Sequence, residues 1–142
     1  MIDIIGTLRQ IHRRANQLFD FATARLRLME TGGSYTPAAL LTEYDMVIID
    51  TPLGAFKPLK VKIDTTNMTW GDTTILKWYE RISDGGGYVE KDEEEFDGPQ
   101  NIVPLSPMKN IHLEPNRFGF KITIEQSAGT PRAYPWELLS EL

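Results

Sequence analysis

Few residue types in this sequence could carry out catalysis. The chain has no cysteine, which excludes a thiol nucleophile, a disulfide scaffold and a cysteine-ligated metal site. Its two histidines, His12 and His112, lack the short spacing of paired metal ligands. No glycine-rich phosphate loop or nucleophile elbow is present. We therefore expect no enzymatic activity, no catalytic residue, no metal site and no cofactor.

The densest group of possible ligands is the acidic run from Glu90 to Asp97. Its carboxylates could gather a Ca²⁺ ion, which prefers six to eight oxygen ligands, but the run lacks the alternating ligands and spaced glycine of a calcium loop. We interpret it as a solvated loop or hairpin tip. A second hypothesis is that it contacts an arginine-rich segment of a neighbouring subunit. The segment Asp84 to Gly87 is interpreted as a turn.

Trp70 is the one candidate ligand-binding residue. It lies between Asn67-Met-Thr and Gly71-Asp72, in a segment typical of a loop, where an exposed indole could stack on a sugar. Trp78 and Trp136 instead lie in strand patterns, where large aromatic side chains fill cores.

Charge divides the chain into two parts. The 142 residues are 41% hydrophobic and 25% charged, with a net charge of −5. Residues 1–30 have a net charge of +2 and the remainder −7. The acidic total argues against nucleic acid as a main partner, because phosphate binding needs a basic surface. No apolar run approaches the roughly 18–20 residues that span a bilayer, so we expect no membrane association.

The basic part has the pattern of one long helix. From Asp3 to Glu30 there is no proline and a single glycine, Gly6, and the Gly32-Gly33 pair is expected to end the helix. Apolar residues alternate in spacings of four and three, which is typical of a coiled-coil seam. The oligomerisation positions are Ile4, Leu8, Ile11, Ala15, Leu18, Ala22 and Met29, with a charged break at Arg25.

This pattern predicts a helical oligomerisation arm over residues 1–31. Its length of about 42 Å, at 1.5 Å per residue, exceeds what a small sandwich can cover, which favours packing of three or more identical helices. Two alternatives stay open: an amphipathic helix packed on its own domain, and an arginine-rich arm that contacts an acidic partner.

The remaining residues, 32–142, have the pattern of an antiparallel β-sandwich or jelly roll. Short alternating segments are separated by turn residues, and no helical pattern alternates with them. Phe118, Phe120, Ile122 and Ile124 are expected to face the core, and Pro135 is expected to make the last segment an edge strand or a broken one. The expected strands are 44–50, 59–64, 74–82, a strand starting at 88, 111–114, 118–124 and 132–139.

Two segments of this body resemble tailed-phage virion proteins. The first is Val61-Lys-Ile-Asp-Thr-Thr-Asn-Met-Thr-Trp-Gly-Asp72 with Leu76-Lys-Trp-Tyr-Glu80, and the second runs from Gly119-Phe-Lys-Ile-Thr-Ile to Tyr134-Pro-Trp-Glu137. Both are similar to head decoration and fibre-type structural proteins, over residues 58–139. The resemblance implies a non-enzymatic role in the virion, many copies per particle and threefold symmetry.

The favoured function is therefore a capsid decoration or cement protein that forms homo-oligomers, with a trimer favoured, and binds capsid or other virion proteins. The alternative is a carbohydrate- or receptor-binding fibre or adhesin module. A third hypothesis is a small hydrolase with a carboxylate pair. We disfavour it because the alternation of apolar and polar residues places most strand carboxylates on outer faces. The oligomer number and the position in the particle stay open.

Overall fold

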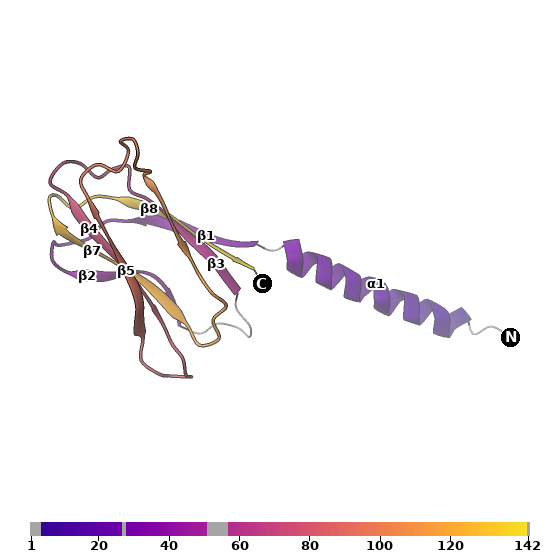
Figure 1. Cartoon of the computed structure of the whole chain (residues 1–142). Coiled ribbons are helices and arrows are strands. Elements are labelled where there is room, and N and C mark those ends of the chain that lie inside the picture. Colours follow the sequence, from indigo (N-terminus) through magenta and orange to yellow (C-terminus); the bar gives the residue numbers. More distant parts are fainter. Residues whose placement is uncertain (1–3, 27, 51–56, 142) are drawn as a thin grey trace.

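The computed structural model describes residues 4–26, 28–50 and 57–141 of the chain. These residues form one N-terminal helix and two antiparallel sheets of four strands each, so the protein is mainly β (Figure 1). The elements are α1 (Ile4–Leu26), β1 (Leu28–Tyr35), β2 (Glu43–Ile49), β3 (Lys57–Asp64), β4 (Thr73–Glu80), β5 (Val89–Asp97), β6 (Met108–His112), β7 (Phe120–Ala128) and β8 (Tyr134–Glu141).

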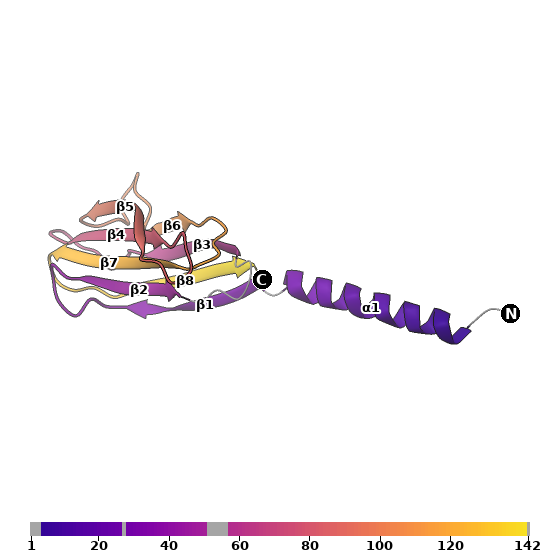
Figure 2. The same cartoon turned by 90° about the horizontal axis from the view of Figure 1, so that it is seen from below.

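The strands pair in a nested pattern. β4 pairs with β5, β3 with β6, β2 with β7 and β1 with β8, as if one long hairpin had been folded over. The resulting sheets have the orders β1-β8-β3-β6 and β2-β7-β4-β5. Figure 2 looks onto the faces of the two sheets, which overlap in that view. The innermost pair is joined through the expected turn, where the amide of Gly86 donates to the Ser83 carbonyl at 3.1 Å.

The core lies between the two layers, as in a β-sandwich. Val61 and Ile63 from one sheet and Leu76, Ile122 and Ile124 from the other are all buried, as their alternation with polar residues predicts. A buried hydrogen bond of 2.6 Å also joins the layers, between the hydroxyl groups of Thr74 in β4 and Tyr134 in β8.

Most of the expected strands are confirmed, with shifted ends. β2, β3, β4, β6 and β7 each overlap an expected segment, and β5 begins at Val89, one residue after the expected start. Phe118, however, precedes β7 and is only half-buried, whereas Phe120 begins that strand and is buried. Ile82 lies beyond the end of β4 and is exposed.

The helix is shorter than expected. It ends at Leu26, and Gly32 and Gly33, which were expected to stop it, lie inside strand β1 opposite Glu137 and Trp136. A Cβ on Gly32 would lie 2.8 Å from the carbonyl oxygen of Trp136, so this glycine permits close approach of β1 to β8. Pairing with β8 supplies backbone hydrogen bonds that the helix would otherwise have provided.

The last strand is not at an edge. β8 lies between β1 and β3, which corrects the expectation drawn from Pro135. Pro135 is tolerated because the pairing of β8 with β3 ends one residue away, at Trp136, so that Pro135 is opposite Ser34 of β1 alone.

The acidic run is likewise a strand and not a loop. Residues 89–97 form β5, the edge strand of its sheet, and every side chain in it is exposed except that of Phe96. Charged side chains on an edge strand oppose pairing with another sheet edge, which explains this composition in structural terms.

The helix α1 extends away from the β body, from the end where β1 begins (Figures 1 and 2). We call this end the arm end and the opposite end the loop end. Segments 65–72, 98–107 and 129–133 connect strands at the loop end. Because no strand lies along α1, the alternative of a helix packed on its own domain is wrong for the residues that the structure describes.

Candidate interaction surfaces

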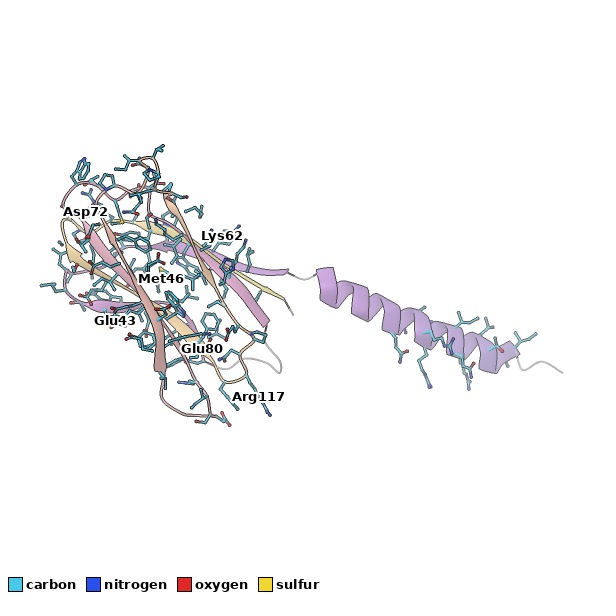
Figure 3. All side chains as sticks on the ribbon, in the orientation of Figure 1. Glu43, Met46, Lys62, Asp72, Glu80 and Arg117 are labelled. Atoms are coloured by element: carbon cyan, nitrogen blue, oxygen red, sulfur yellow. The ribbon has the colours of Figure 1, made fainter. Side chains whose placement is uncertain are left out.

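The apolar stripe of α1 is uncovered over the side chains that the structure describes. Ile4 and Ile5 are each 66% exposed, Leu8 58% and Ile11 59%. Ala15 is exposed on the same stripe, and Figure 3 shows the side chains of this half of α1 with no other element beside them. Burying a large aliphatic side chain contributes roughly 1.5–3 kcal/mol, so this stripe favours association.

The other expected oligomerisation residues have different outcomes. Leu18 and Ala22 belong to α1, but their side chains lie outside the described part. Met29 is not on the helix: it lies in β1, opposite Ser140 of β8. The seam that can be followed in the structure therefore runs from Ile4 to Ala15.

A shallow groove follows one side of α1. Its volume is about 640 Å³, and its polar lining includes Arg9, His12, Arg13 and Asn16, beside apolar Ile5 and Leu8. The amide nitrogen of Asn16 donates to Nε2 of His12 at 3.2 Å, one helical turn away. His12 thus has a local partner in the helix, and His112 lies exposed in β6 of the body.

Trp70 is exposed, as expected, at the loop end. Its side chain is 80% exposed, and the indole lies over Gly98, where an added Cβ would be 3.5 Å from a ring carbon. Ile102, Leu105 and especially Val103, at 97% exposure, add apolar surface on the segment that follows. Trp78 and Trp136 instead pack partly buried against the core, also as expected.

A buried ion pair holds the loop end together. Asp72 is only 1% exposed, and its Oδ2 accepts a hydrogen bond of 2.8 Å from Nε of Arg132. The backbone amides of Thr69 and Thr130 also donate to the Asp72 carboxylate. Burial alone would raise the pKa of Asp72, but the bond from Arg132 and the two amides outweigh it and lower the pKa.

This ion pair connects the two segments that carry the virion-protein resemblance. Asp72 ends the first segment and Arg132 belongs to the second, and Asn67 adds a bond from its side-chain amide to the carbonyl of Ala133 at 2.8 Å. Sequence reasoning missed the pair because 60 residues separate its members. Asn67, Asp72 and Arg132 in these two segments therefore have a structural role at the loop end.

The outer face of the β2-β7-β4-β5 sheet carries a second polar cluster. Glu43, labelled in Figure 3, accepts hydrogen bonds from the hydroxyl groups of Tyr79 at 2.5 Å and Thr123 at 2.6 Å. Burial alone would raise the pKa of Glu43, but these bonds and the charges of Lys77 and Lys121 lower it. Burial and the bond to Glu43 raise the pKa of Tyr79.

The same cluster lines a shallow groove of about 500 Å³. Lys121 is 3.1 Å from Asp45 and lies over the rings of Tyr79 and Tyr88, at 5.0 and 5.3 Å from their centres. Burial and a hydrogen bond to Asp50 raise the pKa of Tyr88 to about 12. The lysine, the tyrosines and the carboxylates thus bind one another, and the cluster joins strands β2, β4 and β7.

The acidic side chains of β5 are not arranged as a metal site. Among residues 4–26, 28–50 and 57–141, no group of three or more histidine, aspartate or glutamate side chains is arranged to hold a metal ion. Glu90 and Glu93 lie 3.7 and 3.4 Å from Lys77, and Lys91 lies 2.9 Å from Glu114. Part of the acidic charge is therefore neutralised within the body.

Comparisons with known proteins found no relative of this chain. No protein-family model matches the chain, and no curated protein matches it significantly. Within the described residues, no helix has the length and apolarity to cross a membrane. The resemblance to tailed-phage virion proteins accordingly stays a prediction.

Proposed function

We propose that the protein is a non-enzymatic structural component of a virus particle, which assembles through α1 and binds a capsid as a decoration protein. The observation that carries this proposal is the apolar stripe of α1, exposed over Ile4, Leu8 and Ile11 with no strand beside it. A chain that leaves such a stripe uncovered gains stability when copies of itself cover it.

The seam composition favours more than two helices. With spacings of four and three, Leu8 occupies the first core position of a heptad, and Ile4 and Ile11 occupy the second. Leucine at the first position and isoleucine at the second favour trimers or tetramers over dimers. We propose a parallel bundle with threefold symmetry, in which the β bodies lie together at one end.

The nested strand pairing supports the same proposal at the level of the fold. We propose that the body is a jelly roll, since the orders β1-β8-β3-β6 and β2-β7-β4-β5 are those of a hairpin rolled into two sheets. Jelly rolls occur in viral capsid and lectin domains. A shared fold does not by itself establish a function, so the exposed stripe of α1 remains the main observation behind the proposal.

Assembly can be tested with paired substitutions on opposite sides of α1. We expect the Leu8→Asp, Ile11→Asp variant to sediment as a monomer because it places charges in the seam. The matched control is Gln10→Asp with Gln17→Asp, which adds the same charges to exposed positions off the seam and should leave the oligomer intact. A monomeric wild type, or equal behaviour of both variants, would contradict the proposal.

The particle assignment has a separate test. Purified oligomer is mixed with capsids of the same source that lack the chain, and binding is followed by co-sedimentation and by the melting temperature of the particle. We expect saturable binding and a higher melting temperature, because a ligand of the assembled capsid stabilises it. No co-sedimentation, or mass spectra of native particles without this chain, would refute the assignment.

A second candidate, a carbohydrate-binding module, is favoured by the exposed indole of Trp70 at the loop end. Its test is a glycan array with the wild type and Trp70→Ala. Binding that disappears in the variant would support this candidate, and no binding by the wild type would eliminate it.

A further inference from the structure

His12 borders the proposed seam of α1. In the heptad of that seam, Leu8 and Ile11 occupy the two core positions, and His12 directly follows Ile11. The residue after the second core position flanks the core of a parallel bundle and lies beside the neighbouring helix. The groove on α1 agrees with this placement, since His12 lines it together with Leu8 of the seam and with Ile5, which precedes His12 by one heptad.

The contact that His12 makes in the structure is that of an uncharged ring. The side-chain amide of Asn16 donates to Nε2 of His12 at 3.2 Å. In this arrangement Nε2 is the acceptor, which requires a neutral imidazole, because a protonated one has no acceptor. Histidine is the side chain whose charge ordinarily changes between pH 5 and 8. A lower pH in that range therefore adds a charge beside the seam.

The charged side chains closest to His12 along α1 are positive. Arg9 lies one turn before it on the helix surface, and Arg13 lines the same groove. The single acidic residue in the sequence of α1 is Asp20, eight positions after His12, and Asp3 precedes His12 by nine positions. Eight residues of helix span about 12 Å, so no carboxylate of α1 pairs with a protonated His12.

Parallel assembly brings the copies of His12 to one level. Copies related by threefold symmetry place three imidazoles around the seam at the same height. Each neighbouring helix presents its other flank, which carries Thr7 and Arg14, and its Asp20 lies as far along the axis as that of the same chain. Protonation thus adds three positive charges where the nearby charges are already positive, and like charges oppose association.

We propose that His12 is a pH switch for assembly through α1: the neutral imidazole permits the bundle, and protonation at mildly acidic pH weakens it. The proposal rests on the proposed self-association of α1 and concerns the regulation of that same seam. The assembled state binds protons less well than the separate chains do, so the stability of the bundle is present at neutral pH and is lost as the pH falls.

The test measures assembly against pH. Sedimentation equilibrium of the full chain is recorded at about pH 7.5, 6.5 and 5.5, where histidine titrates and most carboxylates stay ionised. We expect the association constant of the oligomer to fall about eightfold or more toward the lowest pH, because a factor of about two at each of three copies multiplies. About 1 M sodium chloride should reduce this change, since the Debye length is then about 3 Å.

Two substitutions at His12 reproduce its two charge states. His12→Gln stays neutral, and we expect it to assemble equally well at every pH. His12→Arg stays charged, so at the highest pH it should assemble no better than wild type does at the lowest. The control is His112→Gln, which removes the other histidine of the chain, exposed in β6, and should respond to pH as wild type does.

The outcomes separate the switch from self-association. An oligomer whose association constant does not change over this range of pH would overturn the switch and leave self-association intact. A pH response that persists in His12→Gln, or one that disappears in His112→Gln, would also overturn it. A wild type and a His12→Gln variant that are both monomeric at every pH would refute self-association, and the switch with it.

Discussion

The β body and the helix α1 differ in how their apolar residues are covered. In the body, side chains such as Val61, Ile122 and Ile124 are fully buried between two sheets. In the first half of α1, where the side chains are described, Ile4, Leu8 and Ile11 are more than half exposed. The body therefore completes its own core, whereas the described stripe of α1 stays uncovered within a single chain. The apolar residues of the body thus stabilise the fold, and those of α1 are the ones that we propose for assembly.

The difference between the body and α1 is tested most strongly by replacing one large apolar side chain with alanine in each of them. Phe120→Ala should destabilise the body by about 3–5 kcal/mol because it opens a cavity beside fully buried neighbours. Leu8→Ala should leave the body's free energy of unfolding unchanged and weaken self-association. Denaturant unfolding followed by the body's tryptophans measures the first quantity, and sedimentation the second. Equal losses of body stability would show that α1 is part of the same cooperative unit.

A smaller effect is expected at the loop end. Asp72→Asn should cost about 2–3 kcal/mol at neutral pH, since it weakens charge-assisted hydrogen bonds from Arg132 and two backbone amides. The pKa of Asp72 is lowered in the folded state from its ordinary value of 3.8. Its stabilisation is therefore complete above about pH 4 and is lost as the pH falls through the lower folded value.

Unfolding curves between pH 2 and pH 7 check this dependence. The difference in free energy of unfolding between wild type and Asp72→Asn should decrease steadily at acid pH. A difference that stays constant with pH would show that the charge of Asp72 does not stabilise the loop end. The helix variant Leu8→Ala provides the comparison, because its effect on the body should be absent at every pH.

A further reduction in stability is expected from Gly129→Ala, at roughly 2 kcal/mol or more. Gly129 has a φ of +88°, which alone costs an alanine about 1–2 kcal/mol, and an added Cβ would also clash with Oδ1 of Asp72. Gly85→Ala provides a matched control, since its φ of +65° is also positive but no atom lies within 4 Å of an added Cβ. The difference in melting temperature between the two variants measures the contact with Asp72. Equal losses would attribute the effect to the backbone alone.

The smallest effect is expected at Trp70. Trp70→Ala should change the free energy of unfolding by less than about 0.5 kcal/mol, because the indole is largely outside the body. The change should reduce the emission of exposed tryptophan while Trp78 and Trp136 continue to report unfolding. A loss above 1 kcal/mol would make the contact of Trp70 with Gly98 a structural one and weaken the case for ligand binding.

Alternation predicted the buried strands well because it depends only on local residue order. Val61 and Ile63 share one face of β3, and Ile122 and Ile124 share one face of β7. Those faces are buried, and the alternation indicates this without knowledge of which strands pair. The position of β8 could not be predicted in this way, since Pro135 is compatible with an interior strand only when the neighbouring strand ends beside it. Gly32 and Gly33 were misassigned for the same reason: their role depends on Trp136, a residue more than 100 positions later.

The candidate surfaces were only partly predictable. The seam from Ile4 to Ala15 follows from spacing alone, and Trp70 from its loop composition. The groove beside that seam, lined by Ile5, Leu8 and Arg9 among others, stays uncovered because no strand lies along α1, and this could not be predicted from spacing. The run from Glu90 to Asp97 was predicted to be a loop, because edge position is set by pairing and not by composition.

The nested pairing has a consequence for the order of folding during synthesis. β1 pairs with β8, so β1 leaves the ribosome well before the strand that it pairs with. The helix α1 precedes all strands and needs only local hydrogen bonds, so it forms early. On polysomes, neighbouring nascent chains therefore display α1 before their bodies can close.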